Sequence, residues 1–172
     1  MILGIGNLLF SDEGFGVRVV QRLMEQYEFE EGVFLVDGGV LGLNLLGVIS
    51  EADDLIVVDA IRNRGAPGDL YRLEGDAIPE RIRAKNSLHQ VDFLEALTLC
   101  RALDKGPPNT VILGVEPADI ETLGIELTPV VAGKIDPVIE MVFTELKRLN
   151  LSCRKRNSDV SCDPFKSCEY PE

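Results

Sequence analysis

The sequence predicts an α/β fold, a three-layer sandwich in which a mostly parallel five-stranded sheet carries helices on both faces. Three observations favour this fold. Short apolar runs of strand length recur along the chain, segments with helical periodicity separate them, and the runs are nearly continuous, as in strands that are covered on both faces. With 172 residues, 45% of them hydrophobic, the chain has enough apolar mass for one core.

The first half of the chain supplies three predicted strands and two predicted helices. The strands are the apolar runs at residues 1–5, 33–36 and 55–58, each of which stops at a glycine or an aspartate. The helices are expected at 13–27 and 41–50. In the first helix the apolar positions at helical spacing are Val17, Val20, Leu23 and Met24. This order gives β-α-β-α-β, the pattern of a parallel sheet with right-handed crossovers.

The second half completes the sheet and its helical layers. Residues 68–73 alternate in polarity, which predicts a half-exposed, antiparallel edge strand. Ser87 begins a capping box that opens a helix to about residue 100. Residues 110–115 form the last buried strand, and 128–149 form a helix that is kinked or restarted at Pro137.

Net charge separates residues 1–150 from the rest of the chain. This body holds 13 Lys and Arg against 25 Asp and Glu, a net charge of −12. An acidic surface disfavours nucleic acid and anionic membranes as partners. No apolar run approaches the length of a membrane span, and no signal peptide precedes the first strand, so a cytoplasmic protein is expected.

Residues 151–172 have a different composition. They carry four basic and four acidic residues, and three of the four cysteines of the chain, Cys153, Cys162 and Cys168. Their spacing matches no zinc-binding pattern, and apolar periodicity is lacking. The sequence therefore predicts a cysteine-containing, poorly ordered tail outside the 1–150 domain, with no assigned role.

Four residues are candidates for chemistry at one edge of the predicted sheet. Asp37 and Asp59 follow the second and third strands, Glu13 follows the first, and His89, the only histidine, stands in the first turn of the helix after residue 87. Parallel strands end at a shared edge, where ligands of such sheets bind. Carboxylates with one imidazole suit a divalent metal such as Zn, Ni, Mn or Fe(II), and softness does not choose between these metals.

Each candidate also has an ordinary structural explanation. Glu13 can complement the positive end of a helix, and His89 can be a surface residue near a helix start. Asp37 and Asp59 can be turn residues that accept hydrogen bonds from the backbone after them.

Other catalytic and binding motifs are weaker. Gly4 and Gly6 after the first strand suggest a dinucleotide fingerprint, but Leu9 stands where the third glycine belongs. No nucleophile elbow or P-loop occurs. Cys100 and His89 lie eleven residues apart on one predicted helix, about 16 Å, too far for a catalytic pair.

The motifs of the body resemble the endopeptidases that mature the large subunit of nickel–iron hydrogenases. The likeness lies in GIGNLLFSDEGFGVRV (4–19), DGGVLG (37–42), LIVVDAI (55–61), GAPG (65–68), SLHQ (87–90), GVEP (114–117) and GIELTP (124–129). It covers residues 1 to about 149, so residues 1–150 are expected to form one hydrogenase-maturation-protease-like α/β domain.

The resemblance implies a substrate and a set of site residues. The family's metal-binding positions fall on Glu13, Asp59 and His89, and its DGG motif on Asp37. It implies that the protein recognises nickel delivered within a hydrogenase large-subunit precursor and removes a C-terminal extension. The partner would be that precursor, with no nucleic acid or membrane.

The chemistry stays open at this point. Either the metal acts as a Lewis acid, or a carboxylate, Asp37 or Glu13, acts as general base. Two other functions are alternatives: a nickel-sensing chaperone of the precursor that cuts nothing, and a nucleotide-binding α/β enzyme that uses Gly4, Gly6 and Asp37.

Overall fold

The predicted five-stranded sheet forms the middle layer of the molecule. The computed structural model describes residues 1–40, 45–75, 78 and 88–156. The sheet has the order β3-β1-β4-β6-β5. Its strands are β1 (Ile2–Ile5), β3 (Leu35–Gly39), β4 (Asp54–Ala60), β5 (Leu70–Glu74) and β6 (Asn109–Val115). All neighbouring strands are parallel except β5, which pairs antiparallel with β6 at the edge. The predicted fold class and the antiparallel edge strand are confirmed.

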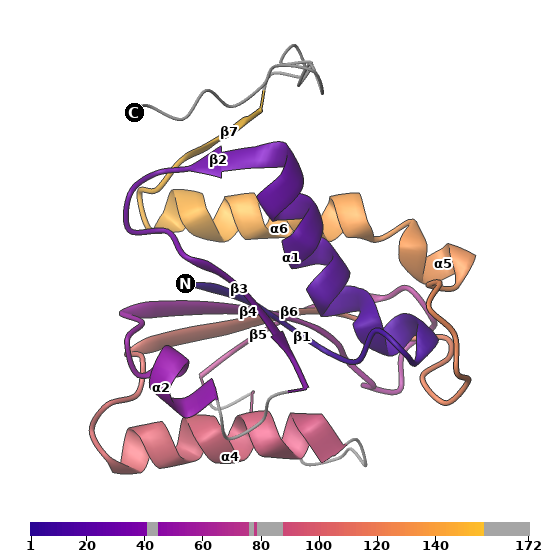
Figure 1. The fold of residues 1–172 in the computed structure, drawn as a ribbon, viewed down its shortest axis with the longest axis horizontal. Coiled ribbons are helices and arrows are strands. Elements are labelled where there is room, and N and C mark those ends of the chain that lie inside the picture. Colours follow the sequence, from indigo (N-terminus) through magenta and orange to yellow (C-terminus); the bar gives the residue numbers. More distant parts are fainter. Residues whose placement is uncertain (41–44, 76–77, 79–87, 157–172) are drawn as a thin grey trace, which may run out of the picture.

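Helices cover both faces of this sheet (Figure 1). On one face lie α1 (Phe15–Gln26) and α6 (Ile135–Arg148), and on the other lie α2 (Leu46–Ile49) and α4 (Leu88–Ala102). A short 3-10 helix, η1 (Ser11–Gly14), precedes α1, and α5 (Pro129–Ala132) precedes α6. Among the described residues, no helix has the length and apolar character needed to cross a membrane.

The strands divide their side chains between two cores, as strand alternation requires. In β4, Ile56 and Val58 pack with α1 and α6, whereas Leu55 and Val57 pack on the α2 and α4 side. The fully buried Phe15 and Phe93 are the largest side chains of the two cores. Because both faces are apolar, the central strands read in sequence as continuous apolar runs.

Three predicted helices differ in extent from those in the structure. The segment expected at 13–27 divides into η1 and α1, because Ser11 begins a tight turn with a φ of 40° before the regular helix. Of the helix expected at 41–50, α2 covers only 46–49, and residues 41–44 lie outside the described residues. The last helix restarts at Ile135, which places Pro137 in a first turn, where proline is tolerated.

A small second sheet changes the boundary of the predicted tail. Strand β7 (Cys153–Lys155) pairs antiparallel with β2 (Tyr27–Phe29), which directly follows α1. The backbone N–H of Arg156 also donates to Gln26 O at 2.7 Å. These contacts hold residues 151–156 on the body and not in a tail. The sequence did not indicate this because a three-residue strand is too short to show an apolar pattern. The poorly ordered character expected of 157–172, including Cys162 and Cys168, falls outside the described residues.

A buried ion cluster fastens the edge strand to the helical layer. Glu145 of α6 accepts hydrogen bonds from Arg72 Nε and Nη2 of β5 at 2.8 and 3.0 Å, and from Arg148 at 2.7 Å. The Arg72 guanidinium holds the pKa of Glu145 below its usual range. Glu145 is only 5% exposed, so this paired fork is a fixed cross-link between β5 and α6.

Candidate active site at the carboxyl ends of the strands

Glu13 and Asp59 lie at the edge where the four parallel strands end. Asp59 is the penultimate residue of β4, and Glu13 belongs to η1, which follows β1 and packs against β4. Figure 1 shows η1 and the beginning of α1 at this edge. Both carboxylates are buried, with exposed fractions of 4% for Asp59 and 8% for Glu13. Buried carboxylates beside an open sheet edge are functional-site candidates.

Glycines allow this close approach of η1 and α1 to the strand ends. A Cβ on Gly16 would collide with the carbonyl oxygens of Ile5 and Val58, and one on Gly6 with the carbonyl of Glu13. Gly6 also has a φ of 137°, which L side chains rarely adopt. A Cβ on Gly4 would likewise meet the carbonyl oxygen of Gly16, so both glycines of the GxG sequence serve the close packing of η1 and α1 against the strand ends.

The α4 helix covers the face of the sheet on which Asp59 lies. Asp59 alternates with Val58 and shares the face of Val57, which packs in the core beneath α2 and α4. The first turn of α4 holds His89, as predicted, and this end of the helix lies at the carboxyl edge of the sheet (Figure 1). The side chain of His89 lies outside the described part of the chain. The backbone therefore brings Glu13, Asp59 and His89 to one edge.

Asp37 lies on the other face of the sheet from Asp59. It is level with Gly4 and Val58 in the sheet, so its side chain is on the α1 face, opposite to that of Asp59. Its carboxylate is exposed and accepts hydrogen bonds from Gln21 Nε2 and from the backbone N–H of Gly39, both at 3.1 Å. These contacts correspond to the turn-residue alternative. The sheet does not bring Asp37 together with Asp59.

Asp12 is a buried carboxylate to which the sequence analysis assigns no role. It is fully buried and accepts four hydrogen bonds. The donors are Ala118 N and Asp119 N at 2.9 Å, Thr128 N at 2.7 Å and Thr128 Oγ1 at 2.9 Å. Asp12 thereby ties η1, which carries Glu13, to the loop after β6. Its position directly before Glu13 in the SDEG motif was the only available signal.

Glu116 is a second carboxylate without a predicted role. It follows β6, is 6% exposed, and its Oε2 accepts hydrogen bonds from Asn63 N at 2.7 Å, Gly65 N at 3.1 Å and Tyr71 Oη at 2.7 Å. Burial and the neighbouring Glu116 carboxylate raise the pKa of Tyr71 to about 12. Glu116 fixes the loop that follows Asp59, and its signal in the sequence was the GVEP motif.

A metal at this edge would meet an incomplete set of protein ligands. Among the side chains that the structure describes, no three His, Cys, Asp or Glu residues are arranged to hold a metal ion. The donor types at this edge are the carboxylates of Glu13 and Asp59 and the imidazole of His89, which suit a divalent metal.

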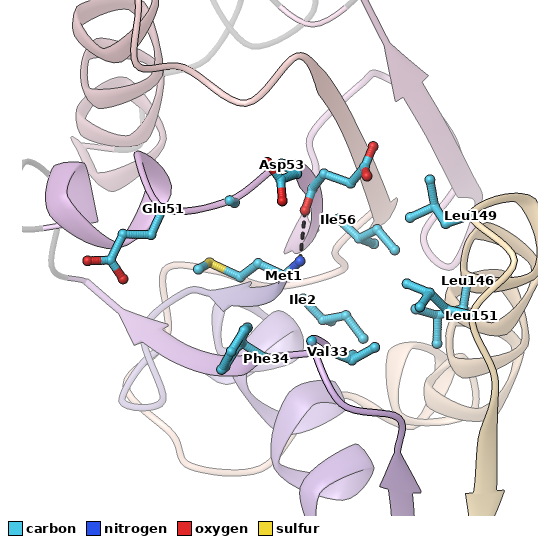
Figure 2. A pocket seen from close by; sticks show the side chains of 13 residues that line it. Met1, Ile2, Val33, Phe34, Glu51, Asp53, Ile56, Leu146, Leu149 and Leu151 are labelled. Atoms are coloured by element: carbon cyan, nitrogen blue, oxygen red, sulfur yellow. Dashed lines mark hydrogen bonds between the residues drawn. The ribbon is translucent and has the colours of Figure 1, made fainter.

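A cavity of about 190 Å³ lies at the opposite edge of the sheet (Figure 2). Met1, Ile2, Phe34 and Ile56 line it together with Leu146 of α6, and the Met1 ammonium donates to Asp54 O at 2.7 Å. These residues begin β1 and β4 or precede β3, whereas Glu13 and Asp59 lie where strands end. This cavity is therefore separate from the candidate site.

Comparison with known proteins shows the family. A family model described as hydrogenase maturation protease, HycI, matches residues 17–145. The hydrogenase expression/formation protein HupD of Thiocapsa roseopersicina is 38% identical over 165 residues, covering 95% of this chain and 75% of HupD. The hydrogenase 2 maturation protease of Escherichia coli (strain K12) is 34% identical over 159 residues, covering 92% and 96%.

Solved structures agree in fold and sequence. The hydrogenase maturating endopeptidase HybD from E. coli matches with a TM-score of 0.86 at 35% identity, over 90% of this chain and 96% of HybD. The [NiFe] hydrogenase maturation protease HybD from Thermococcus kodakarensis matches with a TM-score of 0.69 at 25% identity, over 84% and 96%. Sequence and fold therefore agree: the chain belongs to the hydrogenase maturation protease family.

Proposed function

We propose that this endopeptidase removes the C-terminal extension of a nickel-loaded [NiFe] hydrogenase large-subunit precursor. The observation that carries the proposal is the pair of buried carboxylates, Glu13 and Asp59, at one sheet edge in a member of this family. The precursor is the partner, and nickel belongs to that substrate. The reaction is assigned to the cytoplasm, and the acidic body, with its net charge of −12, disfavours nucleic acid or an anionic membrane as a partner.

Recognition in this proposal depends on an incomplete ligand set. Glu13, Asp59 and His89 contact the nickel of the precursor, whose own cysteines supply the remaining ligands. Carboxylate and imidazole donors are compatible with Ni²⁺. Contact with the metal fixes the position of the precursor and places one peptide bond at the strand-end edge, which is a proximity effect.

Cleavage then requires attack by water on the scissile carbonyl carbon. A carboxylate takes a proton from the water as the C–O bond forms, and the proton passes to the amine nitrogen as the C–N bond breaks. Nickel can supply Lewis-acid polarisation of the carbonyl. Of the two candidate bases we favour Glu13, one of whose carboxylate oxygens would contact the nickel while the other takes the proton, because Asp37 lies on the face opposite to that of Asp59 and is bonded to Gln21 and Gly39.

The test compares cleavage of a precursor with and without bound nickel. The purified protein is mixed with each form of the precursor, and the mass of the precursor is followed. A nickel-dependent loss of a C-terminal peptide is expected. Binding without any change of mass, for every cognate precursor, would instead support the nickel-sensing chaperone.

Variants separate the roles of the carboxylates. Asp59→Asn should lower the cleavage rate about 100-fold or more if Asp59 contacts the metal. Glu13→Gln should abolish cleavage, whereas Asp37→Asn should leave most of the rate if Glu13 is the base. Asp136→Asn, whose side chain is 82% exposed and pairs with Arg22 of α1, is the control. Full activity of Asp59→Asn would remove Asp59 from the site.

A further inference from the structure

Three large apolar side chains are exposed together beside the candidate site. Leu9, Leu123 and Ile125 are 59%, 74% and 62% exposed. A parallel bridge between Phe10 and Gly124, with the N–H of Gly124 donating to Leu9 O at 2.9 Å, joins the two segments. Residues that flank a bridged pair point to the same face, so these three side chains form one patch, the apolar ribbon surface.

This surface is held firmly and adjoins the segment that carries Glu13. Leu9 stands four residues before Glu13 in the same turn region. The buried Asp12 carboxylate binds the N–H of Asp119, and Arg18 of α1 donates to the carbonyl of Ile125. Three apolar side chains on a hydrogen-bonded backbone are pre-ordered for contact, which lowers the entropy cost of binding.

The longer segment of the apolar ribbon surface carries only acidic charges of its own, and two arginines from other segments, Arg18 and Arg62, contact it. Residues 106–133 contain four acidic residues and no Lys or Arg. Asp119, Glu121 and Glu126 lie in the loop that carries the surface, and Glu121 pairs with Arg62 at 3.2 Å. Three carboxylates against two arginines leave this face acidic, so a partner with apolar side chains flanked by positive charge is complementary to it.

We propose that Leu9, Leu123 and Ile125 dock an apolar segment of the hydrogenase precursor that is flanked by Lys or Arg. The inference rests on the proposed function, because a protein substrate cut at the strand-end edge must cover the surface beside that edge. A second copy of this chain fits less well, since a two-fold contact would place the same acidic loop against itself. The surface thus supplies affinity for the protein substrate, while the carboxylates supply its metal contact.

The test uses a double variant and a matched control. Leu123→Ser with Ile125→Ser removes most of the surface, and both positions are exposed enough to keep the fold. Leu99→Ser with Leu103→Ser removes two leucines that are 43% and 53% exposed near the other end of α4. The double variant should raise KM for a nickel-loaded precursor about 10-fold or more, with a smaller change in kcat. The control should match the parent protein.

Binding measurements keep the two proposals distinguishable. If the parent protein cleaves the precursor and the double variant has the same KM, the docking proposal is overturned and the proposed function stands. If the parent binds but never cleaves, a loss of precursor binding in the double variant supports docking without proteolysis, and unchanged binding overturns it. Sedimentation supplies the last check, because a parent dimer that the double variant converts to monomers would assign the surface to a second copy instead.

Discussion

Replacing Asp12 should loosen the segment that carries Glu13. Its carboxylate is fully buried and accepts hydrogen bonds from Ala118, Asp119 and, twice, Thr128. In Asp12→Ala all four donors lose their acceptor, and each unpaired donor costs about 1 kcal/mol or more. Part of this loss is offset because a buried charge disappears, so a net destabilisation of about 3–5 kcal/mol is expected.

Asp12→Asn gives an internal check on this magnitude. Oδ2 accepts three of the four hydrogen bonds, so the amide oxygen should occupy that position and the NH₂ group should face Thr128 N. Only the N–H of Thr128 then faces another donor in place of an acceptor, and the expected loss of unfolding free energy is about 2–3 kcal/mol. The order of stability is therefore parent protein, Asp12→Asn, Asp12→Ala.

Urea unfolding followed by circular dichroism measures these differences. In thermal unfolding of a chain of this length, a loss of 3–5 kcal/mol corresponds to a fall in Tm of roughly 6–20 °C. Asp136→Asn, an exposed carboxylate paired with Arg22, should change stability by less than about 1 kcal/mol. If Asp12→Ala costs no more than this control, the hydrogen bonds to Asp12 do not stabilise the fold and the argument is refuted.

Three further predictions concern other parts of the molecule. Pairing with Arg72 lowers the pKa of Glu145 below its ordinary value of 4.5. The stability that this carboxylate contributes is therefore present above about pH 4.5 and is lost as the pH falls through its folded pKa. The difference in unfolding free energy between the parent and Glu145→Gln should shrink in acid, and a constant difference would contradict this. Gly16→Ala should destabilise the fold by about 2 kcal/mol or more, because the added Cβ meets backbone oxygens. Gly47→Ala, whose Cβ meets nothing within 4 Å, should be neutral or stabilising. Equal Tm values for the two variants would refute the packing argument. Thr110→Val should stabilise by about 1 kcal/mol, since its buried hydroxyl finds no partner among the residues that the structure describes; a lower midpoint of urea unfolding would show that the hydroxyl is satisfied.

Burial on both faces explains why the sheet was readable from the sequence. The run at residues 55–58 serves two cores at once, so each of its residues is apolar, and its identification needs no knowledge of distant partners. The same holds for the strand at 110–115. Strand β7 escaped prediction because its three residues gain their order from β2, which lies more than 120 positions earlier in the chain.

The sequence by itself determined the class of fold, the family resemblance and the edge at which the chemistry is expected. Strand direction and apolar patterning are local properties, and parallel strands bring their carboxyl ends together whatever the details of packing. Glu13, Asp59 and His89 could therefore be proposed from their places at strand and helix ends.

The tertiary structure alone decided which of these carboxylates are neighbours and what holds them. Asp37 and Asp59 have the same appearance in the sequence, yet one residue of difference in register places them on opposite faces of the sheet. Asp12 acquires its role only when the loop at 118–128 brings its donors, and Leu9 joins Leu123 and Ile125 only across the bridge at Phe10 and Gly124. Contacts between residues more than 100 positions apart leave no periodic trace in the sequence, because each partner is chosen by its position in space.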